Sequence, residues 1–389
     1  MRLDTRRLGE LVGVTDEGAR AAADALSRRS GTEIAVDTTG LSVVTEADLC
    51  QQFGDTGHVG VTLGLIGAFP GETLLAFDGA GAEAFVDGPR STTGAGLNAM
   101  DRSSVKEAVT IAAGEFTDSL RAHFDEPVEL TPATYHERIE DGMLFAETPG
   151  SGALLFESEL SDRNTGRSFS LVTVLGPSAV DLLPTDQTDA GVAVSLDGLA
   201  ELDRRLRAGA AEATGLFWAI TDLEARVELS RLRFVPVSAV PFYLDADPVA
   251  GTVFGLNDGR DGYLAVLFGE SSALSVADAM LPVGANGRFD EMTRSAIEEI
   301  GGVMTNSFLD GWTGVFEDSV EHTSPAFVNG AGATVLDPLL SRIAAQREYA
   351  FVLDTTIRTA DGALSCSMLA LPADHLLAEL RSLGRPDCN

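Results

Sequence analysis

The sequence predicts an α+β protein made of two similar halves, on three observations. Each half opens with an alanine-rich amphipathic helix and carries a second long helix near its middle. Short apolar runs between the helices have the length of strands, and each half ends in two such runs about a polar turn, the pattern of a β-hairpin. Long helices that alternate with mostly antiparallel strands favour a domain in which the helices pack on one face of a sheet.

The helices repeat between the halves. Met100–Leu120 aligns with Met292–Trp312 at a constant offset of 192. A second block, Glu17–Val44, aligns with Ala208–Val235 at an offset of 191, and each copy is a helix, a short turn and an alternating strand. A period near half of the chain is too long for a solenoid and indicates a tandem duplication.

The strands follow from apolar runs bounded by turn residues. Strands are predicted at Glu72–Gly79 and Gly262–Gly269, and hairpins at Gly152–Pro177 and Tyr349–Pro372. Each half therefore contains the same succession of helix and strand.

Length and repeat together set the predicted domains. A chain of 389 residues suits two domains of ordinary size. The stretch Leu182–Val194 is polar and contains a proline, as expected of a linker. We therefore predict a first domain over residues 1–181, a linker over 182–194 and a second domain over 195–389.

The charge is strongly acidic, with 59 acidic and 27 basic residues, a formal net charge of −32 and Lys106 as the only lysine. Hydrophobic residues make up 44% of the chain, which excludes disorder. Because the acids are dispersed, we interpret the charge as adaptation to a cytosol with molar salt, in preference to a patch for a basic partner. Nucleic acid is disfavoured as a partner, since no basic face is present.

Metal, disulfide and membrane sites are not indicated. The three cysteines and five histidines are scattered without metal-ligand or disulfide spacing. The N-terminus lacks an apolar leader, and the longest apolar run, Val59–Phe69, is too short to span a bilayer. We expect a soluble, cytoplasmic protein that does not bind a membrane.

The helix at 292–312 carries two stripes and an adjacent glycine pair. The polar stripe consists of Ser295, Glu299, Gly302 and Asn306, and the apolar stripe of Ile297, Ile300, Met304 and Phe308. An apolar stripe docks a helix on a sheet, and a polar stripe can be an ordinary solvent face. The Ser-x-x-x-Glu spacing recurs at Ser103 and Glu107, and a proline follows each helix, at Pro132 and Pro325. Two successive glycines, Gly301 and Gly302, are costly inside a helix and require a reason.

This pattern resembles the CheC/CheX/FliY family of chemotaxis phosphatases. The family motif is Asp or Ser, three residues, Glu, two residues, Asn, and a proline about twenty-two residues later. The matching positions are Ser295, Glu299, Gly302 and Pro325 in the second half, and Ser103, Glu107, Thr110 and Pro132 in the first. The opening helix Leu8–Leu26 is similar to the family's other motif helix, with Glu10 and Gly13 in the glutamate and asparagine places. The matching helix near Leu202 to Arg205 has lost both.

The resemblance implies two fused CheC-like domains, each with long helices on a mostly antiparallel sheet and an internal pseudo-twofold repeat. In the family, the glutamate and asparagine enter the active site of a phosphorylated CheY-type response regulator. The asparagine aligns a water for in-line attack on the aspartyl phosphate, and the glutamate pairs with a lysine of the regulator. The protein needs no cofactor of its own, because the regulator carries the Mg²⁺.

The asparagine itself is absent from this chain. The positions that correspond to it are Gly13, Thr110, Arg205 and Gly302. Gly302 therefore marks a site without its water-orienting group, and we attribute Gly301 to close packing. Asn306 lies about 6 Å further along the helix and is not expected to substitute. The Thr110 hydroxyl can accept from and donate to a water, although an ordinary solvated threonine is an equal alternative.

Two main hypotheses follow. The first is a phosphatase of two-component chemotaxis signalling, with Ser103, Glu107 and Thr110 as its best site and Ser295 and Glu299 as a weakened second site. The second is a catalytically impaired binding module that sequesters the phosphorylated regulator or a CheD-type deamidase. A structural adaptor at the flagellar or archaellar motor switch ranks last.

Overall fold

The computed structural model describes most of the chain as two compact units. It covers residues 2–44, 59–77, 79–85, 97–139, 153–176, 193–244, 248–257, 262–282, 287–312, 320–359, 364–373 and 375–376. The first unit is Arg6–Asp189, and the second is Ala190–Asn389 together with Met1–Thr5. Most of the predicted linker, residues 182–192, lies outside the described residues.

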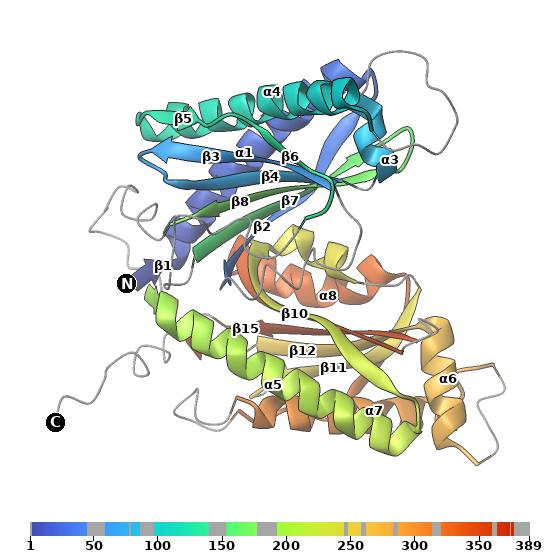
Figure 1. Cartoon of the computed structure of the whole chain (residues 1–389). Helices are drawn as coiled ribbons and strands as arrows, with labels where there is room; N and C mark the ends of the chain where they lie inside the picture. Colours follow the sequence, from blue (N-terminus) through green and yellow to red (C-terminus); the bar gives the residue numbers. More distant parts are fainter. Residues whose placement is uncertain are drawn as a thin grey trace. The chain divides into compact units, whose positions relative to one another are not determined.

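The first unit contains an antiparallel sheet (Figure 1). Its strand order is β2 (Ile34–Val44), β7 (Ala153–Asp162), β8 (Ser168–Leu175), β4 (Gly71–Phe77), β3 (Val59–Gly67) and β5 (Val128–Leu130), and β6 (Thr134–His136) also pairs with β3. The β7–β8 hairpin confirms the prediction at Gly152–Pro177, and β4 confirms the strand predicted at Glu72–Gly79.

The second unit has the same strand order once equivalent strands are matched. Its sheet runs β10 (Ala225–Pro236), β14 (Tyr349–Thr359), β15 (Ser365–Pro372), β12 (Gly262–Gly269), β11 (Val249–Leu256) and β13 (Ala326–Gly330). The hairpin at Tyr349–Pro372 and the strand at Gly262–Gly269 are confirmed. A separate ribbon pairs β1 (Arg2–Asp4) with β9 (Ala193–Ser195), so the first residues of the chain belong to this unit. The α+β prediction is confirmed.

Long helices accompany each sheet. They are α1 (Thr5–Ser30) and α4 (Ala99–Phe124) in the first unit, and α5 (Leu196–Thr221) and α7 (Glu291–Asp310) in the second. The shorter helical segments are α3 (Gly79–Ala82), η1 (Glu83–Phe85), η3 (Val237–Tyr243), α6 (Glu270–Met280) and α8 (Gly332–Ala344). No helix in the described ranges is both long enough and apolar enough to cross a membrane.

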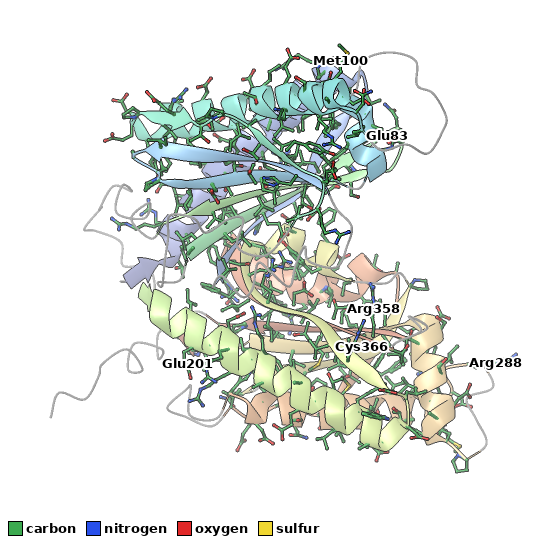
Figure 2. All side chains as sticks on the ribbon, viewed as in Figure 1. Glu83, Met100, Glu201, Arg288, Arg358 and Cys366 are labelled. Atoms are coloured by element: carbon green, nitrogen blue, oxygen red, sulfur yellow. The ribbon has the colours of Figure 1, made fainter. Side chains whose placement is uncertain are left out.

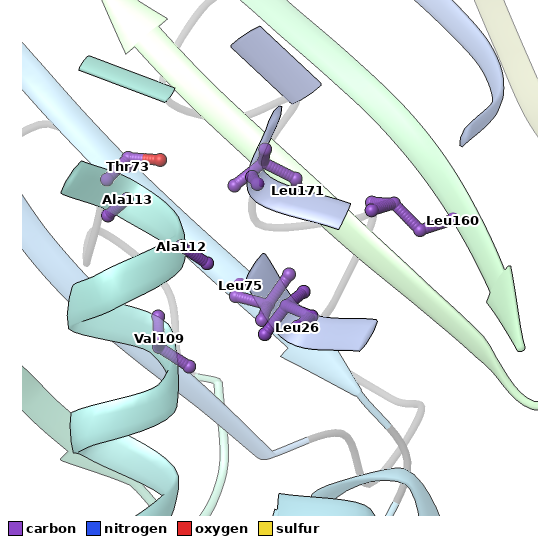
Figure 3. Close-up of a pocket in the computed structure, with 9 residues that line it drawn as sticks. Leu26, Thr73, Leu75, Val109, Ala112, Ala113, Leu160 and Leu171 are labelled. Carbon is purple, nitrogen blue, oxygen red and sulfur yellow. The ribbon is translucent and has the colours of Figure 1, made fainter. Parts of the chain in front are cut away.

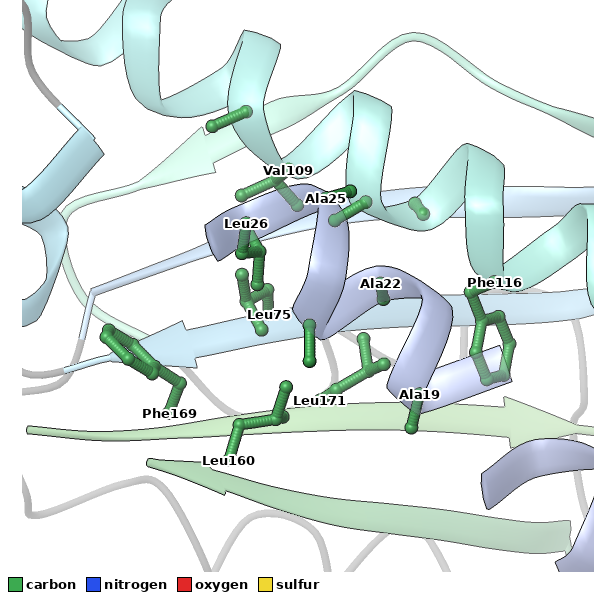
Figure 4. Packing of buried hydrophobic residues seen from close by; sticks show 14 of the residues in the cluster. Ala19, Ala22, Ala25, Leu26, Leu75, Val109, Phe116, Leu160, Phe169 and Leu171 are labelled. Atoms are coloured by element: carbon green, nitrogen blue, oxygen red, sulfur yellow. The ribbon is translucent and has the colours of Figure 1, made fainter. Parts of the chain in front are cut away.

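Small residues let α1 lie close to α4 over the sheet. Ala19 and Ala22 of α1 pack with Val109 and Phe116 of α4 above the apolar side chains of β4, β7 and β8 (Figure 4). At Gly18, an added Cβ would lie 2.8 Å from Cδ2 of Phe116, so only glycine fits without a shift. This contact fixes how the two helices align.

The second unit repeats that contact. An added Cβ at Gly209 of α5 would lie 2.8 Å from the carbonyl oxygen of Phe308 of α7. Gly18 and Gly209 are 191 residues apart, and Phe116 and Phe308 are 192 apart, so the helix pairs align with the offsets seen in the sequence.

The glycine pair of α7 has two different explanations. The predicted apolar stripe, Ile297, Ile300, Met304 and Phe308, is fully buried, so this face of α7 docks in the core. On that side Gly301 is buried, and an added Cβ would overlap Oγ1 of Thr252 on β11. Gly302 is half-buried, and an added Cβ would meet nothing within 4 Å. Packing therefore requires Gly301 but leaves position 302 unconstrained.

Gly301→Ala and Gly302→Ala should accordingly change the free energy of unfolding in opposite directions. Overpacking against Thr252 should make Gly301→Ala destabilising by about 1–3 kcal/mol. Removing a helical glycine in open space should make Gly302→Ala stabilising by about 0.5–1 kcal/mol. Chemical denaturation in molar KCl measures both, and equal effects would contradict the close contact at Gly301.

Candidate functional site

The predicted residues of the first unit lie together on the outward face of α4. Asn98 caps this helix, and its Oδ1 accepts from the backbone N–H groups of Met100 and Asp101 at 2.8 and 3.1 Å. Ser103, Glu107 and Thr110 follow at i, i+4 and i+7 and are all exposed. Within the described residues, the Glu107 carboxylate has no hydrogen bond or ion pair, so it is available to a cation from outside the chain.

The Thr110 hydroxyl already has one partner. Its Oγ1 donates to the backbone carbonyl oxygen of Lys106 at 2.7 Å, a common arrangement for threonine in a helix. The proton is therefore occupied in this rotamer, while the oxygen lone pairs remain open. In this state Thr110 can accept a hydrogen bond from a water but cannot donate one.

The predicted residues of the second unit lie on α7 in the same way. Asp290 caps the helix, and its Oδ1 accepts from the backbone N–H of Thr293 at 2.9 Å. Ser295 and Glu299 are exposed, and neither side chain has a hydrogen-bond or ion-pair partner in the described part of the chain. Gly302 offers no side chain, so this face lacks a polar group at the asparagine place.

Asn306 does not fill that place. Its Oδ1 lies 2.9 Å from Nε2 of His322, whose Nδ1 lies 2.8 Å from the carbonyl oxygen of Thr323. A carbonyl beside Nδ1 requires the proton there, so a neutral His322 accepts at Nε2 and takes the amide N–H of Asn306 once the amide is turned. Asn306 is thus bound to the segment before Pro325, and the expectation that it does not substitute agrees with this contact.

Sequence reasoning missed an arginine that ties each motif helix to the segment after its motif proline. Nε of Arg102 donates to the carbonyl oxygen of Leu97 at 3.0 Å, and its guanidinium lies 5.6 Å from the ring centroid of Tyr135. Arg102 also pairs with Glu137. The aromatic residue lies on β6, directly after Pro132 in the chain, so the helix and the proline segment are held together.

The second unit holds the same contact. Nε of Arg294 donates to the carbonyl oxygen of Phe289 at 2.9 Å, and its guanidinium lies 5.4 Å from the ring centroid of Phe327 on β13. Both arginines and both aromatic residues are related by the offset of 192. The signal was in the sequence, as an arginine before each motif serine and an aromatic residue after each motif proline.

The helix contacts correct the register predicted for α5. Gly18 and Gly209 occupy equivalent places, and so do the buried Leu11 and Leu202. Leu202 therefore does not stand in the glutamate place, because that place belongs to Glu201, the equivalent of Glu10. The prediction that this helix has lost its glutamate is wrong by one residue, and Arg204 in place of Arg205 occupies the asparagine position.

The glutamates of α1 and α5 are engaged within the chain. Oε1 of Glu10 lies 3.2 Å from Nε2 of His123 at the end of α4. Glu201 accepts from Arg204 at 2.6 and 2.8 Å and from Arg205 at 2.7 Å. Hydrogen bonds from these two guanidinium groups lower the pKa of the Glu201 carboxyl to about 2, so it stays ionised and paired. Glu107 and Glu299, by contrast, have no hydrogen-bond or ion-pair partner in the part of the chain that the structure describes.

The interior beneath α4 is apolar and separate from this face. A cavity of about 10 Å³ lies between α1, α4 and the sheet, lined by Leu26, Leu75, Val109, Ala112 and their apolar neighbours with Thr73 (Figure 3). Neither Glu107 nor Thr110 lines it. No group of three or more His, Cys, Asp or Glu side chains in the described ranges could hold a metal ion. The candidate site is therefore an exposed helix face and not part of this cavity.

Comparison with known proteins gives this face a context. No family model matches the chain. A curated relative from Halobacterium salinarum, named "Putative CheY-P phosphatase CheC1", is 24% identical over 181 residues, which is 46% of this chain and 92% of the relative. Over about half of its length the chain is similar to the CheC/CheX/FliY family of chemotaxis proteins. The sequence match to this CheC relative spans about half of the chain.

Solved structures of CheX, FliY and FliM are also similar to part of the chain. FliY from Thermotoga maritima covers 46% of this chain and 95% of its own, at 16% identity and a TM-score of 0.36. The match to the FliM middle domain from H. pylori covers 48% of this chain and 99% of the FliM chain, at 16% identity and a TM-score of 0.39. The match to a chain of a CheX–CheY–BeF3–Mg complex from Borrelia burgdorferi covers 42% of this chain and 99% of that chain, at 17% identity and a TM-score of 0.30.

Arg294→Leu should lower the free energy of unfolding by about 1–2 kcal/mol, because it removes a hydrogen bond and a cation–π contact. Arg342→Leu on α8 is the matched control, since this exposed arginine has no partner within the described ranges and should change stability by less than about 0.5 kcal/mol. Chemical denaturation of both variants tests the contact. Equal losses would show that Arg294 does not hold the proline segment.

Proposed function

We propose that the chain is two fused CheC-like domains, each with an internal pseudo-twofold repeat. The two units share one strand order, one glycine contact between their long helices, and one arginine contact to the segment after the motif proline. Within each unit, the two long helices each carry a glutamate at an equivalent place, as α1 and α4 do with Glu10 and Glu107. These shared features support a duplication of a domain that is itself a repeat.

We propose further that the protein acts on a phosphorylated CheY-type response regulator and hydrolyses its aspartyl phosphate. The observation that carries this is the outward face of α4, where Glu107 has no partner among the described residues and Thr110 presents an acceptor one turn away. The name of the Halobacterium relative supports the same substrate. On this proposal the Mg²⁺ belongs to the regulator, and the protein contributes no cofactor.

The proposed step needs positioning more than covalent help. Glu107 pairs with a cation beside the regulator's phosphoryl group and fixes α4 against it. The Thr110 oxygen accepts a hydrogen bond from a water and holds its oxygen in line with the phosphorus. The water oxygen bonds to phosphorus as the bond from phosphorus to the aspartyl oxygen breaks. The aspartate leaves as a carboxylate, and the water proton goes to the released phosphate.

A specific observation favours the alternative, a module that binds the regulator or a CheD-type deamidase without catalysis. Gly302 lies in open space, so no packing constraint explains the missing side chain. Glu299 remains exposed and unpaired within the described residues, which preserves a group for docking. On this account α7 docks the partner but cannot orient a water.

Phosphate release from a phosphorylated regulator of the same cell, in molar KCl, separates the two functions. The wild type should accelerate release, and Thr110→Ala should reduce that acceleration by about a hundredfold because the water loses its acceptor. Thr110→Ser keeps the hydroxyl and is the matched control. If neither wild type nor variant accelerates release while the protein still retains the regulator, the binding module is correct.

Position 302 allows a gain of activity to be tested. In a Thr110→Ala background, Gly302→Asn supplies the family's amide on α7 without a steric clash. We expect release to rise by about tenfold or more over Thr110→Ala alone, as an amide can hold the water that glycine cannot. Gly302→Ala in the same background is the control. No gain at unchanged binding would show that α7 does not face the phosphoryl group.

A further inference from the structure

The exposed apolar side chains of the first unit concentrate on the motif helix. Among the described residues of this unit, the large hydrophobic side chains that are exposed are Ile66, Met100 and Ile111, at 55%, 81% and 45%. Met100 and Ile111 lie on α4, and Figure 2 shows the Met100 side chain projecting from it. Neither belongs to the core, so folding does not account for them.

These two side chains bracket the open glutamate. Met100, Glu107 and Ile111 are spaced i, i+7 and i+11, which places them on one stripe of the helix within about 40°. Along the axis Met100 lies about 10 Å before Glu107, and Ile111 about 6 Å after it. The outward face of α4 is thus a carboxylate between two apolar contacts.

The second unit repeats the arrangement on α7. Met292 is 56% exposed, Glu299 is exposed, and Val303 is half-buried, with the same intervals along the helix. Both units therefore keep a methionine, a glutamate and a β-branched aliphatic residue in one stripe. These residue types recur at the offset of 192 that relates the two helices.

The solvent gives this arrangement a physical role. In the molar salt that the acidic composition predicts, the Debye length falls to about 3 Å, so an exposed ion pair contributes little to affinity. Apolar contacts are not screened in this way, because their stabilisation comes from the removal of apolar surface from water. A docking face for such a medium needs apolar contacts beside its charge.

We propose that Met100 and Ile111 on α4, and Met292 and Val303 on α7, are apolar docking contacts for the response regulator. The inference rests on the proposed function and specifies the partner's surface, which must hold a cationic group between apolar side chains. Glu107 and Glu299 then supply register and specificity, while the flanking residues supply most of the affinity in salt. Methionine suits this role because its flexible side chain adapts to the partner.

Binding of a beryllofluoride-activated regulator of the same cell, measured by calorimetry in molar KCl, tests the inference. Met100→Gln and Ile111→Gln should each weaken binding about tenfold, which is about 1.4 kcal/mol, without changing the unfolding transition. Because α7 offers a second face, both are made in a Met292→Gln background. Ile66→Gln, at an exposed position on β3, is the matched control and should bind as the background does. Met100→Leu should restore binding.

The outcomes distinguish this inference from the proposed function. Rising KCl should leave the affinity of the Met292→Gln parent for the regulator unchanged or higher. The Met100→Gln and Ile111→Gln variants in that background should lose affinity as KCl rises. If the Met292→Gln parent binds and the Met100→Gln and Ile111→Gln variants in that background bind equally well, the apolar contacts are refuted while the proposed function stands. If wild-type protein does not bind the regulator, both are overturned together.

Discussion

The position of every candidate residue depends on close contact between each long helix and the layer it covers. At Gly18 and Gly209 the absence of a Cβ lets α1 and α5 approach α4 and α7. At Gly301 the same absence lets α7 lie directly on Thr252 of the sheet. Because these contacts bury one side of α4 and α7, the opposite side must face outward. The motif residues are therefore exposed to solvent because the opposite side of each helix packs in the core.

Charge then decides whether the glutamates on the long helices are available. Each glutamate is followed on the helix by the residues at i+3 and i+4, which share its face. After Glu201 these are Arg204 and Arg205, which hold the carboxylate in two ion pairs. After Glu107 they are Thr110 and Ile111, neither of which can neutralise it. The side chains one turn away therefore decide the outcome: they pair with the glutamate on α5 and leave the glutamate on α4 unpaired by its own helix.

Much of the fold could be predicted from sequence, because hydrophobic periodicity and turn residues are local signals. The hairpin at Gly152–Pro177 and the buried stripe of α7 follow from period alone and are confirmed. The register of α5 was wrong by one residue, because an alanine-rich helix aligns almost equally well at neighbouring offsets. The contact of Gly209 with Phe308 fixes it at the offset of 191 that the neighbouring block Glu17–Val44 already showed.

The arginine contacts could not be predicted from hydrophobic periodicity, because they join residues more than thirty positions apart in the sequence. Their signal was an arginine and an aromatic residue that recur at one offset, and it acquires meaning only when β6 and β13 are seen beside the helices. The state of the glutamates was also beyond local reasoning in the first unit. Glu10 meets His123 across two helices, and no spacing rule connects them.

The adjacent glycines of α7 show how packing and function can be separated at neighbouring positions. Gly301 is constrained by the sheet, so its identity says nothing about chemistry. Gly302 is constrained by nothing within 4 Å, so a side chain there would have cost the fold little. The equivalent position on α4 carries Thr110, which retains an acceptor. On the proposed function, docking groups persist on both helices while a water-holding group persists on one. That function therefore assigns binding of the partner to both helices and hydrolysis to α4.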